Sequence, residues 1–344
     1  MGDVLILYIG GFPVTIRIGK ISYWHVHAWD YTRQAQEHPD TEIAAVWDED
    51  PTRGQEAAAK LKVPFFANLD DMLRDGGIDA VIVDAPTNRH QEVMTAAAKA
   101  KKHIFTEKVI APTLHEVNAI LEEVRIAGVK LTVSLPRLND AYTLAIQDLL
   151  RRKILGRVTQ VRVRLSHNGA TAGWLPEHFF SLEQCGGGAL IDLGCHPMYL
   201  TRLFLDEPIV DVTAQFGYIT NKEVEDNAVS VLSTPSGAIG IVEAGFVNSF
   251  SPFSIEVHGT DGTLLYGTPD NRLMLRAKEH GEGWQEVPLP QQRESAFHQW
   301  VRHIQTGTDA DENIRLGVEL TKLMEASNRS ARERRAIRLD ELEQ

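Results

Sequence analysis

Short apolar runs alternate with amphipathic segments over the first 134 residues. The apolar runs predict buried strands, at 16–21, 42–47, 78–83, 103–106 and 129–133. Segments between them repeat apolar residues at helical spacing, at 51–61, 88–101 and 113–127. Strands that alternate with helices in this way predict a parallel sheet with right-handed crossovers. Residues 15–134 are therefore expected to form a doubly wound, Rossmann-like α/β domain, preceded by a leader or an extra strand at 1–14.

The pattern changes after about residue 136. Helices are predicted at 142–153 and from the glycines at 186–188, with a strand of alternating character at 158–165. Further short strands follow one another, at 209–218, 227–234, 238–246, 253–258 and 262–266. Amphipathic helices close the chain, at about 293–305 and 314–331. Residues 135–344 are therefore expected to form an α+β domain for substrate binding and oligomerisation. It has a large open, mostly antiparallel sheet, and its last helices can pack back on the first domain.

Composition narrows the class of protein. The chain has 344 residues, which suits two domains, and 43% of them are hydrophobic, enough for a core without disulfides. Its two cysteines, Cys185 and Cys195, suit a reducing compartment. The formal charge of −12 disfavours a nucleic-acid partner. The longest apolar run, at 4–14, is too short to span a membrane. We therefore expect a cytoplasmic protein with neither a nucleic-acid nor a membrane partner.

The turn after the first strand lacks the glycines of a dinucleotide-binding fold. The G-x-G-x-x-G fingerprint is replaced by Ser22-Tyr23-Trp24-His25-Val26-His27. The following helix still offers free amides and a positive dipole end to a phosphate. Ser22, Trp24 and His25 are therefore expected to contact the cofactor, with Trp24 beside the pyrophosphate. Whether the lost glycines weaken or abolish binding is left open by the sequence.

Asp48 ends the second predicted strand. A carboxylate there can accept both adenosine ribose hydroxyls and would repel a 2′-phosphate, which favours NAD over NADP. The alternative is a helix N-cap before Pro51, a role that Asp50 could also fill. Arg53 is a weak signal for NADP.

His25 and His27 allow two other interpretations. A His-x-His pair after a first strand is also how metal-dependent hydrolases on a (β/α)8 barrel begin. The chain shows no further His, Asp or Lys set with the spacing that such a barrel needs. The plainer alternative is that both rings are packed or solvent-facing on the first helical turn.

Three later segments, taken together, are more specific evidence of the kind of protein than any one of them alone. They are Ala85-Pro86-Thr87-Asn88-Arg89-His90, 102–108 (Lys-His-Ile-Phe-Thr-Glu-Lys) and 186–197, which begins Gly-Gly-Gly and holds Asp192-x-Gly-x-His196. At these segments the chain resembles the glucose–fructose oxidoreductase, inositol dehydrogenase and MocA (Gfo/Idh/MocA) family. Residues 224–227 and 255–262 also resemble family segments, so the likeness runs in order over about 15–340. The chain departs from the family at the first turn and at Val109, where the family has proline.

Three residues in these segments suit the oxidation of a secondary alcohol. That reaction needs a base near neutral pH, which His196 can supply. Asp192 lies four residues earlier, so both are expected on one face of the helix that the glycines begin. Lys108 ends a strand, and its ammonium can stabilise a developing alkoxide. The resemblance implies the same roles for these three residues. The alternatives are a structural histidine, a surface lysine and a glycine hinge.

The resemblance also implies contacts around the reacting atoms. Pro86, Asn88, His90, Glu107 and Lys108 are expected to flank the nicotinamide half of the cofactor. A second set is expected to bind the substrate: Arg137, His167, Asn168 and Trp174, together with Asp192 and His196. A domain-linking ion pair is the alternative for Arg137, and ordinary loop positions are the alternative for the next three.

The sequence as a whole predicts an NAD-dependent oxidoreductase that transfers a hydride between a nicotinamide cofactor and a sugar, inositol or related polyol. The resemblance implies a homodimer or homotetramer paired through the second sheet. Three alternatives stay open. They are an NAD-dependent enzyme that cleaves glycosides, a non-catalytic relative of the same fold, and a metal-dependent hydrolase that uses His25 and His27.

Overall fold

The computed structural model describes residues 15–267 and 270–342, so the expectation for residues 1–14 lies outside the described part of the chain. Six parallel strands form the first sheet, in the order β3-β2-β1-β4-β5-β6. Their bounds are β1 Ile16–Ile21, β2 Thr41–Trp47, β3 Phe65–Phe66, β4 Ala80–Val83, β5 His103–Thr106 and β6 Leu131–Val133. The strand order reverses between β1 and β4, and ligands bind parallel sheets of this kind at that point.

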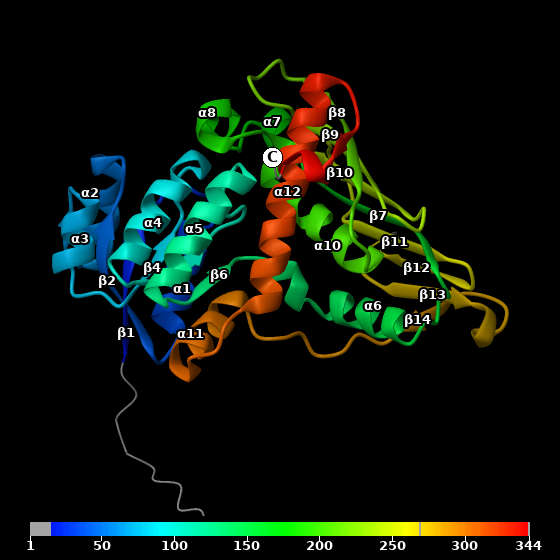
Figure 1. The fold of residues 1–344 in the computed structure, drawn as a ribbon, viewed down its shortest axis with the longest axis horizontal. Helices are drawn as coiled ribbons and strands as arrows, with labels where there is room; N and C mark the ends of the chain where they lie inside the picture. The colour runs from blue at the N-terminus through cyan, green and yellow to red at the C-terminus, as the bar shows by residue number, and fades with distance from the viewer. Residues whose placement is uncertain (1–14, 268–269, 343–344) are drawn as a thin grey trace, which may run out of the picture.

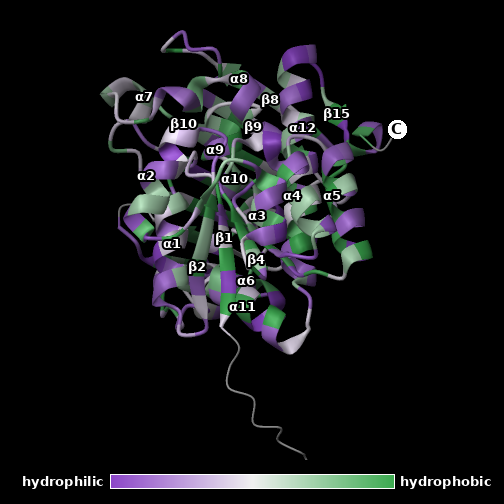
Figure 2. Ribbon diagram, turned by 90° about the vertical axis from the view of Figure 1, so that its left-hand side faces the viewer, coloured by the Kyte–Doolittle hydropathy of each residue, from purple (hydrophilic) through white to green (hydrophobic). Residues whose placement is uncertain are grey.

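Helices cover both faces of this sheet. They are α1 Ala28–Glu37, α2 Pro51–Leu61, α3 Leu69–Asp75, α4 His90–Lys99 and α5 Leu114–Ala127. Figure 2 shows β1 and β4 between α1 and α2 on one side and α4 and α5 on the other. Because both faces are buried, every residue of β4 is apolar. The predicted doubly wound sheet is confirmed. The short elements β3 and α3 were not predicted.

Nine strands form the second sheet, in the order β14-β13-β12-β11-β7-β10-β9-β8-β15. Neighbouring strands are antiparallel except β7 and β10, as predicted for a mostly antiparallel sheet. The bounds are β7 Val158–Ser166, β8 Asp211–Gly217, β9 Asn227–Ser233, β10 Ile239–Gly245, β11 Ser254–Gly259, β12 Gly262–Tyr266, β13 Leu273–Ala277, β14 Gln285–Val287 and β15 Ile337–Arg338. The last three strands of this list were not predicted.

Helices pack on one face of the second sheet and join it to the first (Figure 1). They are α6 Ala141–Arg151, α10 Cys195–Leu205 and α12 Asp311–Glu333, whereas α11 Ala296–Thr306 packs against β5, β6 and α1 of the first domain. Among them, α10 contacts β7 and β10, whereas α12 contacts β8, β6 and α5. Short helical segments complete the chain between β6 and α10: η2 Pro136–Asn139, α7 Gly169–Ala172, η3 Glu177–Phe180, α8 Leu182–Cys185 and α9 Ala189–Asp192. No described helix has the length and apolar character needed to cross a membrane.

The single helix predicted from the glycines is wrong. The structure has two helices, α9 and α10, with a break at Leu193 and Gly194. A Cβ on Gly194 would lie 2.6 Å from the Leu190 carbonyl oxygen and 2.9 Å from the Cβ of Ala244 on β10. A side chain at this close approach to β10 would clash, so only glycine fits there.

Candidate active site

Lys108 is the centre of a buried charge cluster at the carboxyl ends of the parallel strands. It follows β5 directly, and its Nζ lies 3.0 Å from Oδ1 of Asp192 and 3.3 Å from Oε1 of Glu107. Burial opposes the charge of Lys108, but these carboxylates outweigh it and hold the pKa of the ammonium above its usual value. The two predicted residues Lys108 and Asp192 therefore meet as a cation and an anion, each in its charged form.

The His25 side chain belongs to this cluster. Its Nε2 lies 3.7 Å from Oδ1 of Asp192 and 3.9 Å from Oε1 of Glu107. Its Nδ1 accepts a hydrogen bond from the backbone amide of His27, at 3.2 Å. The uncharged ring therefore carries its proton on Nε2, directed at the two carboxylates. Burial lowers the pKa of His25 and favours this uncharged form.

A second layer of polar side chains supports the cluster, and the sequence analysis missed it. Lys20 and Asp84 form an ion pair, and both side chains are fully buried. The hydroxyl of Tyr31 donates to Glu107 and also lies 2.6 Å from Oγ of Ser134. The sequence does contain a signal for the Lys20–Asp84 pair. Lys20 lies inside the first apolar strand, and Asp84 comes directly after the apolar strand that pairs with it.

His196 lies on the first turn of α10, but Asp192 does not orient it. In the described part of the chain, its Nδ1 pairs with the hydroxyl of Tyr199, at 3.0 Å, and no bond joins it to Asp192. The expected common helix face is wrong because the break at residues 193–194 separates the two side chains. Burial, then Lys108 and Arg137, place the pKa of His196 well below its usual range, so the ring is uncharged at neutral pH.

A cavity of about 440 Å³ reaches this region beside α1, a size within the range of small-molecule sites. Glu107, Arg137 and His196 line it, with residues of α1 and the start of α11. The Arg137 guanidinium bonds the Tyr142 hydroxyl at 3.1 Å and stacks 4.3 Å from the Phe253 ring centre. In the described residues Arg137 has no carboxylate partner, so the alternative of a domain-linking ion pair is not what the structure contains.

The other predicted substrate residues cluster with one another. His167 stacks on Phe246, with ring centres 5.0 Å apart, and its Nδ1 accepts from the Gly169 amide. Trp174 contacts His167, with ring centres 4.6 Å apart, and its indole N–H donates to Asn168. The structure thus gathers His167, Asn168 and Trp174 at the end of β7, and none of them contacts Lys108 or His196 within the described residues.

The first turn keeps the shape of a glycine turn without the glycine. Ser22 has φ 68°, a left-handed backbone that glycine adopts most easily. Three of the amides that could cradle a pyrophosphate already have acceptors. Tyr23 N donates to Asp48, Trp24 N to the Ser22 hydroxyl, and His25 N to the Asp84 carbonyl. In this arrangement the turn presents no free amide at those three positions.

Trp24 closes the turn against the second half of the chain. Its ring stacks on Phe179, with centres 5.1 Å apart, and its indole N–H donates to Gln184 at 2.9 Å. His178 bonds the Trp24 carbonyl oxygen at 3.1 Å. The expected place of Trp24 beside a pyrophosphate therefore requires these contacts to separate first.

The Asp48 carboxylate also already has hydrogen-bond partners. Its oxygens accept from Tyr23 N at 2.8 Å and from two nitrogens of Arg53, at 2.6 and 3.0 Å, and its side chain has no exposed area. A carboxylate at the end of β2 has the right chemistry for ribose hydroxyls, provided that Arg53 turns away. The Asp48 carboxylate thus suits the adenosine ribose of a dinucleotide as an acceptor, whereas its pyrophosphate needs the turn to open.

The remaining predicted cofactor residues differ in accessibility. His90 is buried, and its ring nitrogens lie 3.0–3.1 Å from the carbonyl oxygens of Ala85, Val109 and Ile110. It therefore holds the segment that follows Lys108. The Lys108–Val109 peptide bond is cis. Pro86 is buried, whereas Asn88 is exposed.

The residues do not favour a metal centre. His25, Asp84 and Glu107 have ligand atoms within 4.8 Å of one another, and His27 is not part of this group. The ammonium of Lys20 already pairs with Asp84, and His25 keeps a proton on Nε2 because Nδ1 accepts a hydrogen bond. A metal would therefore have to displace both the Lys20 cation and that proton.

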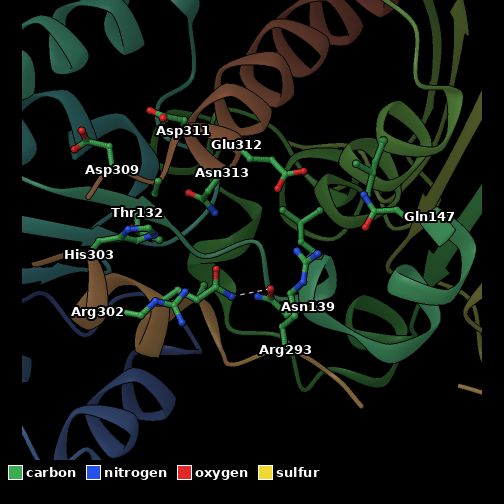
Figure 3. Close-up of a pocket in the computed structure, with 15 residues that line it drawn as sticks. Thr132, Asn139, Gln147, Arg293, Arg302, His303, Asp309, Asp311, Glu312 and Asn313 are labelled. Carbon is green, nitrogen blue, oxygen red and sulfur yellow. Dashed lines mark hydrogen bonds between the residues drawn. The ribbon is translucent and has the colours of Figure 1, made fainter. Parts of the chain in front are cut away.

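A separate polar cavity of about 220 Å³ lies between η2, α11 and the start of α12 (Figure 3). Gln299 donates to Asn139 across it, at 2.8 Å. None of the predicted site residues lines this cavity. The predicted chemistry therefore belongs to the cavity beside α1.

Two family models match consecutive parts of the chain. The model described as an oxidoreductase family with an NAD-binding Rossmann fold matches residues 16–135. The model of the GFO/IDH/MocA C-terminal domain matches residues 143–265. Together they cover more than half of the chain.

The chain is similar to curated enzymes over most of their length. It is 29% identical to a 1,5-anhydro-D-fructose reductase of Ensifer adhaerens, over 74% of this chain and 80% of that enzyme. It is 25% identical to a myo-inositol 2-dehydrogenase of Thermotoga maritima, over 88% and 92%. Among solved structures, an aldose–aldose oxidoreductase from Caulobacter crescentus superposes with a TM-score of 0.79 at 21% identity, over 94% and 99%. That likeness supports the fold alone.

Proposed function

The chain belongs to the Gfo/Idh/MocA family of oxidoreductases with an NAD-binding Rossmann fold, and on that premise we propose that it transfers a hydride between a nicotinamide dinucleotide and a sugar, inositol or related polyol. Curated relatives are named for reactions on such compounds, a reductase and an inositol dehydrogenase among them. When bound, the nicotinamide supplies or takes up the hydride. The residues of this chain bind and orient the substrate and handle its proton.

The observation that carries the proposal is the Lys108 ammonium held by Asp192 and Glu107 beside the cavity that His196 lines. We assign to Lys108 the stabilisation of the substrate oxygen as it gains negative charge. Asp192 keeps Lys108 charged and in place, and it can also bind a substrate hydroxyl. We assign to His196 the contact with the same oxygen and the exchange of its proton.

For the cofactor we propose NAD, with NADP less favoured. Asp48 at the end of β2 supports this choice, because a carboxylate there accepts ribose hydroxyls and repels a 2′-phosphate. Ser22, Trp24 and His25 are proposed beside the pyrophosphate once the turn has opened. Pro86, Asn88, His90 and Glu107 are proposed around the nicotinamide, with His90 acting through the backbone that it holds.

For the substrate we propose contacts with Arg137 in the cavity and with His167, Asn168 and Trp174 at the end of β7. The exposed indole of Trp174 suits the apolar face of a sugar ring. We also propose a cytoplasmic homodimer or homotetramer formed through the helix-free face of the second sheet. That face carries complementary charges, such as Arg162 and Arg164 on Glu243.

Replacing Lys108 by methionine tests the function. The purified chain is supplied with NAD⁺ or NADP⁺ and a panel of inositols, aldoses and alditols, and reduced nicotinamide is followed by absorbance. We expect turnover with NAD⁺, and a loss of about a hundred- to a thousandfold in kcat for Lys108→Met, because an alkoxide-stabilising group is removed. The control is Lys99→Met, an exposed lysine on α4 that pairs only with Glu123 in the described residues. Full activity of Lys108→Met would overturn the assignment.

A further inference from the structure

Tyr199 links His196 to the backbone of the loop that carries Arg137. The tyrosine is 1% exposed on α10, one turn after His196. Its hydroxyl lies 3.0 Å from Nδ1 of His196 and 3.1 Å from the backbone nitrogen of Arg137. These are the partners of the hydroxyl in the described part of the chain.

The direction of the two hydrogen bonds follows from counting protons. The Arg137 amide can only donate, so the tyrosine oxygen accepts from it. If the oxygen also accepted from His196, the phenolic proton would have no acceptor in a buried place, which is costly. The proton therefore points at Nδ1 of His196. Burial raises the pKa of Tyr199 well above its usual value, so the hydroxyl keeps that proton.

We propose that Tyr199 is a positioning residue that holds uncharged His196 in the tautomer with its proton on Nε2. In that form His196 presents a hydrogen-bond donor to the substrate oxygen. The proposal rests on the proposed function only for the identity of that oxygen. The tautomer itself is a property of the free protein.

The consequence concerns how the site handles a proton. In its resting form, the ring can polarise a carbonyl or stabilise an alkoxide, as Lys108 also does. To take up a proton at Nε2, the ring must adopt the other tautomer, and the Tyr199 hydroxyl must turn to accept from Nδ1. Tyr199 thus decides whether His196 rests as a donor or as a base.

Other charged groups around His196 come from several elements, and they must be counted in any titration. They are Lys108 after β5, Asp192 at the end of α9, Arg137 in η2 and His27 before α1, with Glu107 lining the same cavity. None of them is hydrogen-bonded to the His196 ring in the described residues. A change in the tautomer after a Tyr199 substitution therefore reports on the hydroxyl.

The test is nitrogen-15 NMR of the histidine rings in the free protein, without cofactor or substrate. A His196→Gln variant identifies the signals. In the unsubstituted protein at pH 7.5 we expect an unprotonated Nδ1 and a protonated Nε2. In Tyr199→Phe, which keeps the ring, we expect the tautomer ratio to shift by about five- to tenfold toward Nδ1–H, the worth of one hydrogen bond. We also expect the pKa of His196 to rise, because the lost bond favoured the uncharged ring.

Tyr142→Phe is the matched control. It removes a buried phenol that contacts Arg137 but not His196, and it should leave the His196 tautomer unchanged. Nδ1–H in the unsubstituted protein, or no shift in Tyr199→Phe, would overturn the proposal, and the first of these readouts does not require Tyr199→Phe to fold. If the tautomer is as expected but no polyol is oxidised, the proposed function fails and the Tyr199 assignment stands.

Discussion

The Lys108 cluster and the first turn are neighbours, because His25 of the turn lies beside Asp192 and Glu107. The two regions nevertheless satisfy their buried polar groups in different ways. In the cluster, cations and carboxylates alternate and leave charge available beside a cavity. In the turn, each of three consecutive amides is satisfied by a side chain or a carbonyl of the same chain, and Trp24 covers them. On the proposed function, the chemical part of the site is therefore formed before a ligand arrives, whereas the proposed phosphate-binding turn has to open.

The largest effect on stability should come from the buried Lys20–Asp84 ion pair. Replacing Lys20 by methionine leaves the Asp84 carboxylate buried without its cation. We expect a loss of about 3–5 kcal/mol in the free energy of unfolding, measured by urea denaturation. As a control, Arg74→Ala removes an exposed pair with Asp71 and should cost less than about 1 kcal/mol. Equal costs in the two variants would mean that the buried pair does not hold the cluster together.

A smaller effect should follow from loosening Trp24. Gln184→Leu on α8 removes the acceptor of the indole N–H and destabilises the closed turn by about 1 kcal/mol. Since we propose that cofactor binding opens that turn, NAD(H) should bind about fivefold more tightly, as measured by calorimetry and tryptophan fluorescence. Gln147→Leu on α6, away from the turn, is the control and should not change binding. Weaker binding in Gln184→Leu would show that the closed contact helps to hold the cofactor.

The smallest effect concerns acid stability. Burial opposes the charge of Asp192, but Lys108 outweighs it and lowers the pKa of this carboxyl in the folded state. A carboxyl with a depressed folded pKa contributes stability above its unfolded pKa, about 4, and that contribution is lost as the pH falls. Asp192→Asn should therefore flatten the fall of the unfolding free energy below about pH 4, measured by denaturation at a series of pH values. An unchanged slope would contradict the depressed pKa. The exposed Asp70→Asn is the control.

Much of the fold was predictable because hydrophobic periodicity reports burial locally. The strands 16–21 and 103–106 were located with their exact bounds from their buried apolar residues, although Arg17 and Lys20 interrupt the first run. The helix 51–61 was predicted with its exact bounds from Pro51 and its apolar spacing. Short elements such as β3 and β15 have two residues each, too few for a period to appear.

The sequence by itself determined the fold class, through local periodicity, and the family, through motifs that keep their spacing; the family resemblance in turn implied that Lys108 and Asp192 share one site. The tertiary structure decided which side chains contact one another. Trp24 stacks on a phenylalanine 155 positions later, and Lys20 meets Asp84 because β1 and β4 are neighbours only after a crossover. His196 pairs with Tyr199 instead of Asp192 because packing on Ala244 breaks the helix at Gly194. Contacts of this kind depend on how distant elements pack, which periodicity along the chain does not encode.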